Sequence, residues 1–300
     1  MTQEIPRTPE AFASANGLRL CYQTFGDPAH PPMVLIMGMG AQMVGWDEDF
    51  CEMLAGRGFW VIRFDNRDAG RSTNFHHAGM PDVASALTRA WMRLPVTAPY
   101  LLDDMALDVA GLMDALHIEE AHLVGASMGG GIAQALAIRR PQRVLSLTSI
   151  MSTTGDPALP SPQPSAMAAV FKPPPNDVRG YVAQYVQTWK VLRAGEFPEE
   201  EARDRARAAR NHERGLNPGG AARQLVAILA SGSRRQALRR VVAPTMVIHG
   251  DADPLVPLAA GEDTARHIPG ADLLVLEGMG HAMPMRFWPR IVEGIVQVAR

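Results

Sequence analysis

Residues Gly125–Gly129 read Gly-Ala-Ser-Met-Gly and form a Gly-x-Ser-x-Gly motif. The motif follows an apolar run, Ala121–Ala126, and precedes a helical pattern, Met128–Arg139. A serine in a sharp turn between a strand and a helix has a strained backbone, and small residues two positions before and after it avoid a collision. The turn exposes the hydroxyl beside the N-terminal N–H groups of the helix. This setting predicts that Ser127 is a nucleophile; the alternative is a glycine-rich turn with an incidental serine.

A serine hydroxyl becomes a good nucleophile when a base accepts its proton and an acid orients that base. His281 is the candidate base because it ends a glycine-rich loop, Gly278–His281, just after the last predicted strand. Asp251 and Asp253 both follow the predicted strand Pro244–His249. On position alone, either aspartate is a candidate for the acid.

These residues need a scaffold that brings several strand ends together. Short runs rich in Val, Ile and Leu alternate with helical patterns, which predicts an α/β fold with a mostly parallel sheet covered by helices on both faces. An Asn-Gly pair between Ala11–Ala15 and Leu18–Phe25 predicts an antiparallel hairpin before that sheet. The parallel strands are predicted at Pro32–Met37, Phe59–Asp65, Ala121–Ala126, Val144–Ile150, Pro244–His249 and Asp272–Glu277. The helices between them are predicted at Asp47–Arg57, Asp103–Leu116, Met128–Arg139, Ala259–His267 and Phe287–Val298.

The alternation stops between residues 152 and 240. Prolines from Pro157 to Pro164 and at Pro173–Pro175 predict an extended lead-in, because proline fits neither a central strand nor a helix interior. Helical patterns follow at Val178–Arg193, Pro198–Arg214 and Ala221–Ala230. We therefore divide the chain into a core of residues 1–151 and 241–300 and an inserted helical cap of residues 152–240.

The cap is expected to cover the catalytic end of the sheet and to set specificity rather than chemistry. Glu199–Arg214 mixes acidic and basic residues at helical spacing, which favours a solvated helix face over a nucleic-acid-binding patch. The irregular stretch Asn74–Pro99 is a further candidate for this cover.

The composition narrows the classes of partner. The 300 residues are 47% hydrophobic and carry 29 basic against 31 acidic side chains, which argues against a disordered chain and against a dedicated nucleic-acid or membrane-surface binder. Two cysteines cannot build a disulfide framework. No apolar stretch approaches the ~20 residues of a membrane-spanning helix, and Met1–Glu10 is too polar for a secretory signal. We expect a cytoplasmic protein whose oligomeric state the sequence leaves open.

The chain resembles the α/β-hydrolases over nearly its whole length, with a cap inserted between the sixth and seventh strands of the family. The order of Ser127, an aspartate and His281 is the order of that family. The resemblance implies that Asp253 is the acid, because family members carry Gly-x-x-Asp followed by an apolar residue and proline, as in Gly250–Pro257. Asp251 then stabilises the loop.

A second segment is similar to one branch of this family in particular. Phe64–Ser72 is similar to the Asp-x-Arg-Gly-x-Gly-x-Ser loop of the family, with Asp68 in place of the usual glycine. Together with Gly278–His281, this loop is most similar to that of aclacinomycin methylesterase-like hydrolases, which cleave carboxylic methyl esters.

An oxyanion hole needs two backbone N–H groups, one of them on the residue after the nucleophile, which is Met128. By resemblance, the second is that of Met39, on the loop after the third strand. Met37 replaces the usual histidine of this loop, which removes a side chain that often braces it.

Methionines gather on the loops at the predicted catalytic end, and flexible thioethers either fill the core or line adaptable apolar pockets. Apolar residues at helical spacing in the cap could also face inward. The candidate pocket residues are Met37, Met43, Trp189, Leu225 and Met279.

The sequence thus predicts a serine hydrolase of carboxylic esters that acts through an acyl-enzyme, on a small apolar ester and water. No cofactor and no metal are expected, because the sequence has no His-Glu-x-x-His motif and no Cys/His cluster. Lactone hydrolysis, carbon–carbon bond hydrolysis and perhydrolysis would use the same serine and stay open. A non-catalytic small-ligand receptor is the alternative of another class, although such a receptor commonly lacks one of the three catalytic groups.

Overall fold

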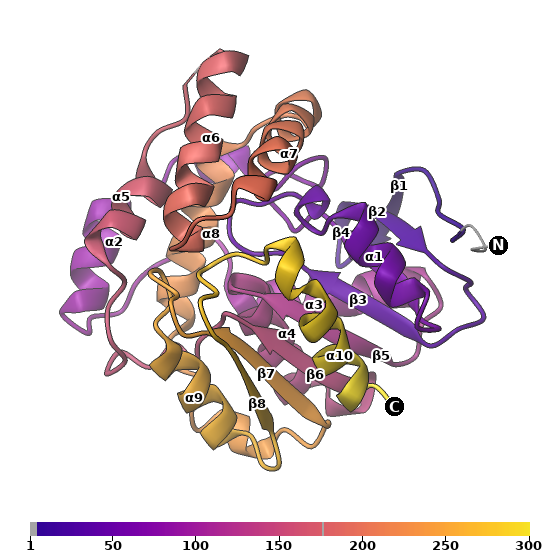
Figure 1. Ribbon diagram of the computed structural model, residues 1–300. Coiled ribbons are helices and arrows are strands. Elements are labelled where there is room, and N and C mark those ends of the chain that lie inside the picture. The colour runs from indigo at the N-terminus through magenta and orange to yellow at the C-terminus, as the bar shows by residue number, and fades with distance from the viewer. Residues whose placement is uncertain (1–4, 176) are drawn as a thin grey trace.

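The computed structural model describes residues 5–175 and 177–300, so the first four residues of the polar segment Met1–Glu10 lie outside the described part. An eight-stranded sheet runs through the chain in the order β1-β2-β4-β3-β5-β6-β7-β8 (Figure 1). β2 pairs antiparallel with β1 and β4, and the remaining neighbours are parallel. The strands are β1 (Ala11–Ala15), β2 (Leu18–Phe25), β3 (Pro32–Ile36), β4 (Trp60–Phe64), β5 (Ala121–Ala126), β6 (Val144–Ile150), β7 (Thr245–Gly250) and β8 (Asp272–Leu276). The predicted fold class and strands are confirmed, and no strand boundary differs from its predicted position by more than one residue.

Period-two alternation along the strands divides the core between the two faces of the sheet. In β3, Val34 and Ile36 pack with α3 and α4, whereas Met33 and Leu35 pack with α1 and α10. α9 packs against β7 and β8. These helices are α1 (Glu48–Ala55), α3 (Leu102–Ala115), α4 (Met128–Arg139), α9 (Leu258–His267) and α10 (Trp288–Val298). Because β3 and β5 to β8 are parallel, their carboxyl ends lie along one edge of the sheet.

Four helices between β6 and β7 form what we call the helical segment, and Figure 1 shows it beside that edge. They are α5 (Pro164–Phe171), α6 (Val178–Arg193), α7 (Glu201–Arg214) and α8 (Pro218–Ser231). The three predicted helices are confirmed as α6, α7 and α8, although Pro198–Glu200 is a separate 3₁₀ turn. α5 was not predicted, because its prolines indicated extended chain. Pro164 instead occupies the first turn of α5, where its missing N–H costs no hydrogen bond.

The stretch Asn74–Pro99 contains a further helix, α2 (Val83–Trp91), that the sequence did not predict. α2 packs against α8, as expected of a segment that joins the cover. Its C-terminal end leaves Trp91 exposed to 85% of its full surface.

The expected solvated face of α7 is wrong for one side of that helix. Arg203 pairs with Asp47 at 2.9 Å, and Arg210 pairs with Glu48 at 2.6 Å. Both acidic residues lie at the start of α1, where negative charge also complements the helix dipole. Arg205 keeps the predicted environment, because it is exposed and pairs with Glu201 on its own helix. The arginine periodicity of α7 therefore marks a contact with the core as well as a solvated face.

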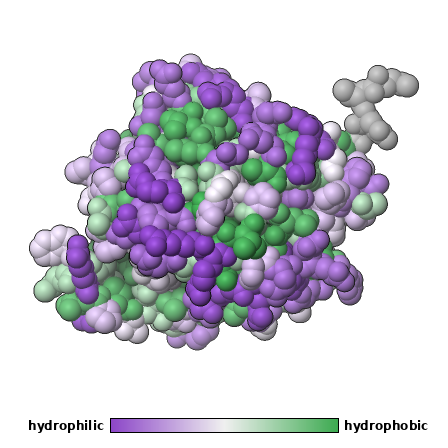
Figure 2. Space-filling view, turned by 90° about the horizontal axis from the view of Figure 1, so that it is seen from below, coloured by the Kyte–Doolittle hydropathy of each residue, from purple (hydrophilic) through white to green (hydrophobic). Residues whose placement is uncertain are grey.

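None of the helices in the described chain is long and apolar enough to cross a membrane. Figure 2 shows apolar residues in several patches, one of them near the top of the view, with polar residues around them. Cys21 and Cys51 are buried free thiols.

Candidate active site

Ser127 lies between the end of β5 and the start of α4, at φ 54° and ψ −119°. A positive φ is costly for a residue with a side chain, so the surroundings must hold this turn. The N–H of Ser127 donates to the Ile150 carbonyl oxygen at 2.9 Å, and the Ser152 hydroxyl donates to the Ser127 carbonyl oxygen at 2.7 Å. A Cβ at Gly125 or Gly129 would collide with backbone atoms. The small residues of the motif are thus required by the turn, as the sequence predicted.

The structure brings Ser127, His281 and Asp253 together. His281 Nε2 lies 3.0 Å from Ser127 Oγ, and His281 Nδ1 lies 2.8 Å from Asp253 Oδ2. The other carboxylate oxygen, Oδ1, accepts the N–H groups of Leu255 and Val256 at 2.9 and 2.8 Å. With its proton on Nδ1 toward the aspartate, the imidazole presents the Nε2 lone pair to the serine hydroxyl. This arrangement suits proton transfer from serine to histidine.

Asp251 does not reach His281. Its Oδ1 accepts the N–H of Gly278 at 2.7 Å, which ties the loop after β7 to the loop after β8. Asp251 therefore supports the loop that carries the histidine.

His249 lies behind the carboxylate of Asp253 and is fully buried. Its Nε2 donates to the Val256 carbonyl oxygen at 2.7 Å and lies 3.6 Å from Asp253 Oδ2. Burial lowers the pKa of His249, which favours a neutral ring. A neutral His249 holds the turn that supplies N–H groups to Asp253.

The loop after β3 lies directly against Ser127. A Cβ at Gly38 would come within 3.3 Å of the Ser127 Cβ. The N–H of Met128, at the first position of α4, has no intrahelical acceptor, and none of the described residues accepts the N–H of Met39. Both groups are free to donate to a ligand.

The Met37 side chain does not brace this loop through a hydrogen bond, but a neighbouring residue does. The buried Asn66 Nδ2 donates to the Met37 carbonyl oxygen at 2.9 Å. The sequence analysis did not single out Asn66, although it lies in the Phe64–Ser72 segment. Its polar side chain directly after a buried strand was the available signal.

The helical segment contacts the loop that carries His281 and the loop after β3. At the first loop, the Leu192 carbonyl oxygen at the end of α6 accepts the N–H of His281 at 2.7 Å, and a Cβ at Gly280 would collide with this backbone. At the second loop, Gln224 of α8 accepts the N–H of Gly40 at 2.7 Å. The sequence analysis missed these contacts because they join residues far apart in the chain and no motif marks them.

The candidate pocket residues lie in different surroundings. Met37 is buried and its thioether reaches Gly45, whereas Met43 and Met279 are fully buried. Trp189 of α6 is half-buried, with its ring centroid 5.8 Å from that of Tyr185, and Leu225 is buried on α8. Their assignment to a substrate pocket stays a prediction.

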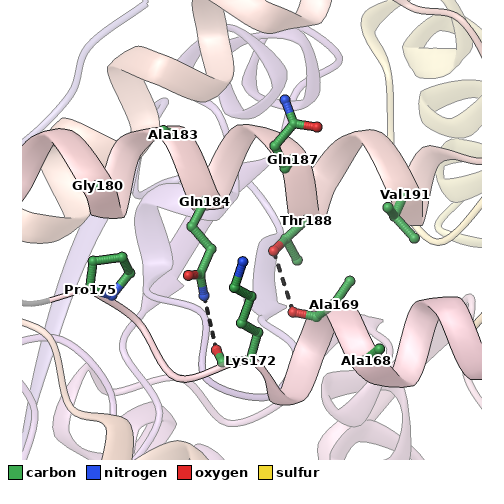
Figure 3. A pocket seen from close by; sticks show the side chains of 10 residues that line it. All are labelled: Ala168, Ala169, Lys172, Pro175, Gly180, Ala183, Gln184, Gln187, Thr188 and Val191. Carbon is green, nitrogen blue, oxygen red and sulfur yellow. Dashed lines mark hydrogen bonds between the residues drawn. The ribbon is translucent and has the colours of Figure 1, made fainter.

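A groove of about 520 Å³ lies between α5 and α6 (Figure 3). Gln184 and Thr188 cross it with hydrogen bonds to the backbone of α5 and the residues that follow. None of the described residues along it is a serine, a histidine or a carboxylate, and its polar side chains are those of Lys172, Gln184, Gln187 and Thr188. Elsewhere in the described ranges, no group of three or more His, Cys, Asp or Glu side chains is placed to hold a metal ion.

The chain is similar in sequence and in fold to several known proteins. Rhodomycin D methylesterase DauP of Streptomyces sp. (strain C5) is 29% identical over 92% of this chain and 93% of its own length. 3-Oxoadipate enol-lactonase 2 of Acinetobacter baylyi is 26% identical over 88% of this chain and 87% of its own length. The solved structure of 2-hydroxy-6-oxo-6-phenylhexa-2,4-dienoate hydrolase from Rhodococcus sp. strain RHA1 superposes with a TM-score of 0.74 at 22% identity, over 98% of this chain and 99% of that one. A family model described as the alpha/beta hydrolase fold matches residues 31–285. With the sheet order and the strand-to-helix turn at Ser127, this match shows that the chain belongs to the alpha/beta hydrolase fold family.

Proposed function

We propose that this protein hydrolyses carboxylic esters through an acyl-enzyme, with Ser127 as nucleophile, His281 as base and Asp253 as the acid that orients it. The observation that carries the proposal is the continuous chain of contacts from Ser127 Oγ through the imidazole to Asp253, at 3.0 and 2.8 Å. A serine with a purely structural role does not require a histidine within hydrogen-bond distance and a buried carboxylate on the other side of that histidine.

In the first half of the reaction, Ser127 Oγ attacks the ester carbonyl carbon while His281 Nε2 accepts the serine proton. The carbonyl π electrons move onto oxygen, and the N–H groups of Met39 and Met128 donate to that oxyanion. The tetrahedral intermediate then expels the alkoxide, which takes the proton from His281 and leaves as the alcohol. The acyl group remains as an ester of Ser127.

In the second half, His281 takes a proton from water, and the hydroxide attacks the acyl-enzyme carbonyl. Collapse of this second intermediate breaks the bond to Ser127 Oγ, and the serine regains its proton from His281. The products are the carboxylic acid and the free enzyme. Every step uses groups of the chain itself and water, so we propose a cofactor-free reaction.

We propose methyl esters of larger acids as the preferred substrates, because the relative named for rhodomycin D methylesterase matches 92% of the chain. Lactone hydrolysis is the second candidate, since the relative named as an enol-lactonase matches 88% of it. The same attack on a cyclic ester would keep the leaving alcohol attached to the acid.

We further propose that residues 152–240 act as a cap that binds the non-reacting part of the substrate. The inward candidates, Trp189 and Leu225, lie on α6 and α8. A cap of this kind would exclude water and strengthen the oxyanion contacts. The cytoplasmic location expected from the sequence stays a prediction.

The proposal is tested by kcat/KM for p-nitrophenyl acetate, methyl esters of acids of graded size, and lactones, each with the wild-type protein and the Ser127→Ala variant. Ester hydrolysis that needs Ser127 and favours methyl esters supports the proposal. A preference for lactones would move the function to the second candidate. An absence of hydrolysis across the panel would contradict the proposal.

A further inference from the structure

Gln224 of α8 is fully buried and joins two loops of the core. Its Oε1 accepts the N–H of Gly40 at 2.7 Å, and its Nε2 donates to the Arg67 carbonyl oxygen at 2.7 Å. Gly40 belongs to the loop after β3 that approaches Ser127, and Arg67 belongs to the loop after β4. One side chain of the helical segment thus sets the spacing of both loops.

The α8 backbone around Gln224 is itself held in place. Arg223 makes a two-pronged ion pair with the buried carboxylate of Asp68, at 2.7 and 2.8 Å, and the Tyr100 hydroxyl donates to the same carboxylate at 2.7 Å. A Cβ at Gly220 would collide with the Asp68 carbonyl oxygen. Asp68 replaces the glycine of the family loop and still adopts φ 66°, in the left-handed region that favours glycine. The departure from the family pattern therefore supplies an anchor for α8.

The loop Met37–Gly40 needs such support because two of its four residues are glycines. Asn66 holds the Met37 carbonyl oxygen at one end, and Gln224 holds the Gly40 N–H at the other. The peptide N–H of Met39 lies between these two fixed points. With both ends fixed, the backbone between them has little freedom to rotate this N–H away from the nucleophile.

We propose that Gln224 is a positioning residue that holds the Met39 N–H in line with the oxyanion formed on attack by Ser127. This inference rests on the proposed function, because it assigns Gln224 a part in the same reaction. With this role for Gln224, the helical segment contributes to the rate of the chemical step as well as to specificity.

The test is the Gln224→Met variant, which keeps the length and burial of the side chain and removes both hydrogen bonds. With p-nitrophenyl acetate we expect kcat to fall by roughly tenfold to a hundredfold and KM to change little, because the lost alignment matters in the transition state. A trifluoromethyl ketone, whose adduct with the serine carries an oxyanion, should bind more weakly by a similar factor. A folded variant with kcat within about twofold of wild type would overturn the inference.

Gln134→Met is the matched control. Gln134 is also fully buried with both ends hydrogen-bonded, to Ser149 Oγ at 3.2 Å and to Arg234 Nε at 3.1 Å, but it lies on α4 and does not touch the Met37–Gly40 loop. The control should keep kcat near wild type. An equal loss of kcat in both variants would show general damage to the core and overturn the inference.

A second variant, Gln224→Glu, decides the question if Gln224→Met fails to fold. A protonated carboxylic acid accepts and donates as the amide does, whereas a carboxylate faces the Arg67 carbonyl oxygen without a proton to donate. The ratio of kcat of this variant to that of wild type should therefore rise as the pH is lowered from about 8 to about 6. A ratio that does not change with pH would overturn the inference.

The two proposals fail in different ways. If Ser127→Ala keeps the activity of wild type, the proposed function fails for any state of Gln224. If Ser127→Ala is inactive and Gln224→Met is fully active, only the role of Gln224 fails.

Discussion

The nucleophile turn and the first half of α8 are both fixed rigidly beside the same edge of the sheet, but by different means. Ser127 is held by its own strand, its own helix and the adjacent strand β6. Gln224 and Arg223 are held by partners more than 140 residues away in the chain. The turn at Ser127 is thus held mainly by nearby backbone geometry, whereas the loop beside it depends on long-range polar contacts.

The long-range contacts of α7 and α8 include buried ion pairs, whereas the turn at Ser127 is held by hydrogen bonds between neutral groups. Arg223 pairs with Asp68, and Arg214 of α7 pairs with Asp65, all four side chains being buried. A buried ion pair adds little net stability over apolar packing, but removing one partner leaves an uncompensated charge. Such pairs therefore fix where α7 and α8 sit on the core.

The largest effect is expected when the groups proposed to react are removed. We expect Ser127→Ala and His281→Ala each to lower kcat for a small ester by roughly 10⁴-fold or more, with the fold unchanged. The double variant should be little worse than either single one, because the two groups act as a unit. Circular dichroism is the control for folding, and turnover of Ser127→Ala within about tenfold of wild type would refute the assignment.

A somewhat smaller loss of kcat is expected when Asp253 is changed, and Asp251, which follows the same strand, provides the control. Asp253→Asn should lower kcat by roughly 10³-fold to 10⁴-fold, because the amide no longer holds the imidazole tautomer that accepts the serine proton. Asp251→Asn is the matched control and should keep most of the activity, since it affects only the bond to Gly278. The opposite ranking would move the acid to Asp251.

The ion pair between Arg223 and Asp68, which anchors α8, should contribute to the free energy of unfolding. We expect Arg223→Met to lower the free energy of unfolding by about 3 kcal/mol, because it leaves the buried carboxylate of Asp68 without its partner. Arg205→Ala is the control on the neighbouring helix and should leave stability unchanged, because its pair with Glu201 is exposed. Urea unfolding measures both, and equal effects would argue against a special role for the anchor.

The same anchor predicts a pH dependence. Burial opposes the charge of Asp68, but hydrogen bonds from Arg223, the Phe75 N–H and Tyr100 hold the pKa of its carboxyl below the ordinary value. A lowered pKa stabilises the fold above the unfolded value of about 3.9 and loses that effect as the pH falls through the folded value. The destabilisation caused by Asp68→Asn should therefore be full at neutral pH and shrink below about pH 4. An unchanged difference across this range would contradict the ion pair.

The smallest effect is expected on specificity, measured as the ratio of kcat/KM between esters of different acyl chains. Trp189→Ala and Leu225→Ala are expected to change the preference among acyl chains by about 1–3 kcal/mol, the value of a few methylenes in a pocket, while a small ester is still hydrolysed. Val191→Ala is the control, because Val191 is also on α6 but lines the groove between α5 and α6. Substrate ratios that do not move in the first two variants, or that move equally in the control, would remove the helical segment from substrate binding.

Most of the scaffold and the three residues that the structure brings together at the candidate site could be predicted from the sequence because their signals are local. Apolar runs mark the strands, and Ser127, Asp253 and His281 each lie within a few residues of a strand end. Parallel strands then bring those ends to one edge. The hairpin turn was equally local, with Asn16 and Gly17 both at positive φ in the structure.

The contacts of α7 and α8 could not be predicted in the same way. Alternating charges look alike whether arginines face water or face carboxylates on another part of the chain, so the periodicity of α7 did not reveal its contact with Asp47 and Glu48. Gln224 carries no motif at all, and Asp68 was noticed only as a departure from a family loop. Its partner on α8 becomes evident only when the fold brings residues 68 and 223 together.

The most direct test of the account is covalent labelling by a fluorophosphonate, followed by mass spectrometry of the digested protein. With Ser127 as the nucleophile, one adduct per chain is expected on the peptide that carries Ser127, with no adduct in Ser127→Ala and much slower labelling in His281→Ala, because the serine then lacks its base. A label on another serine, or equal labelling of the wild-type protein and Ser127→Ala, would contradict the central claim that Ser127 is the nucleophile.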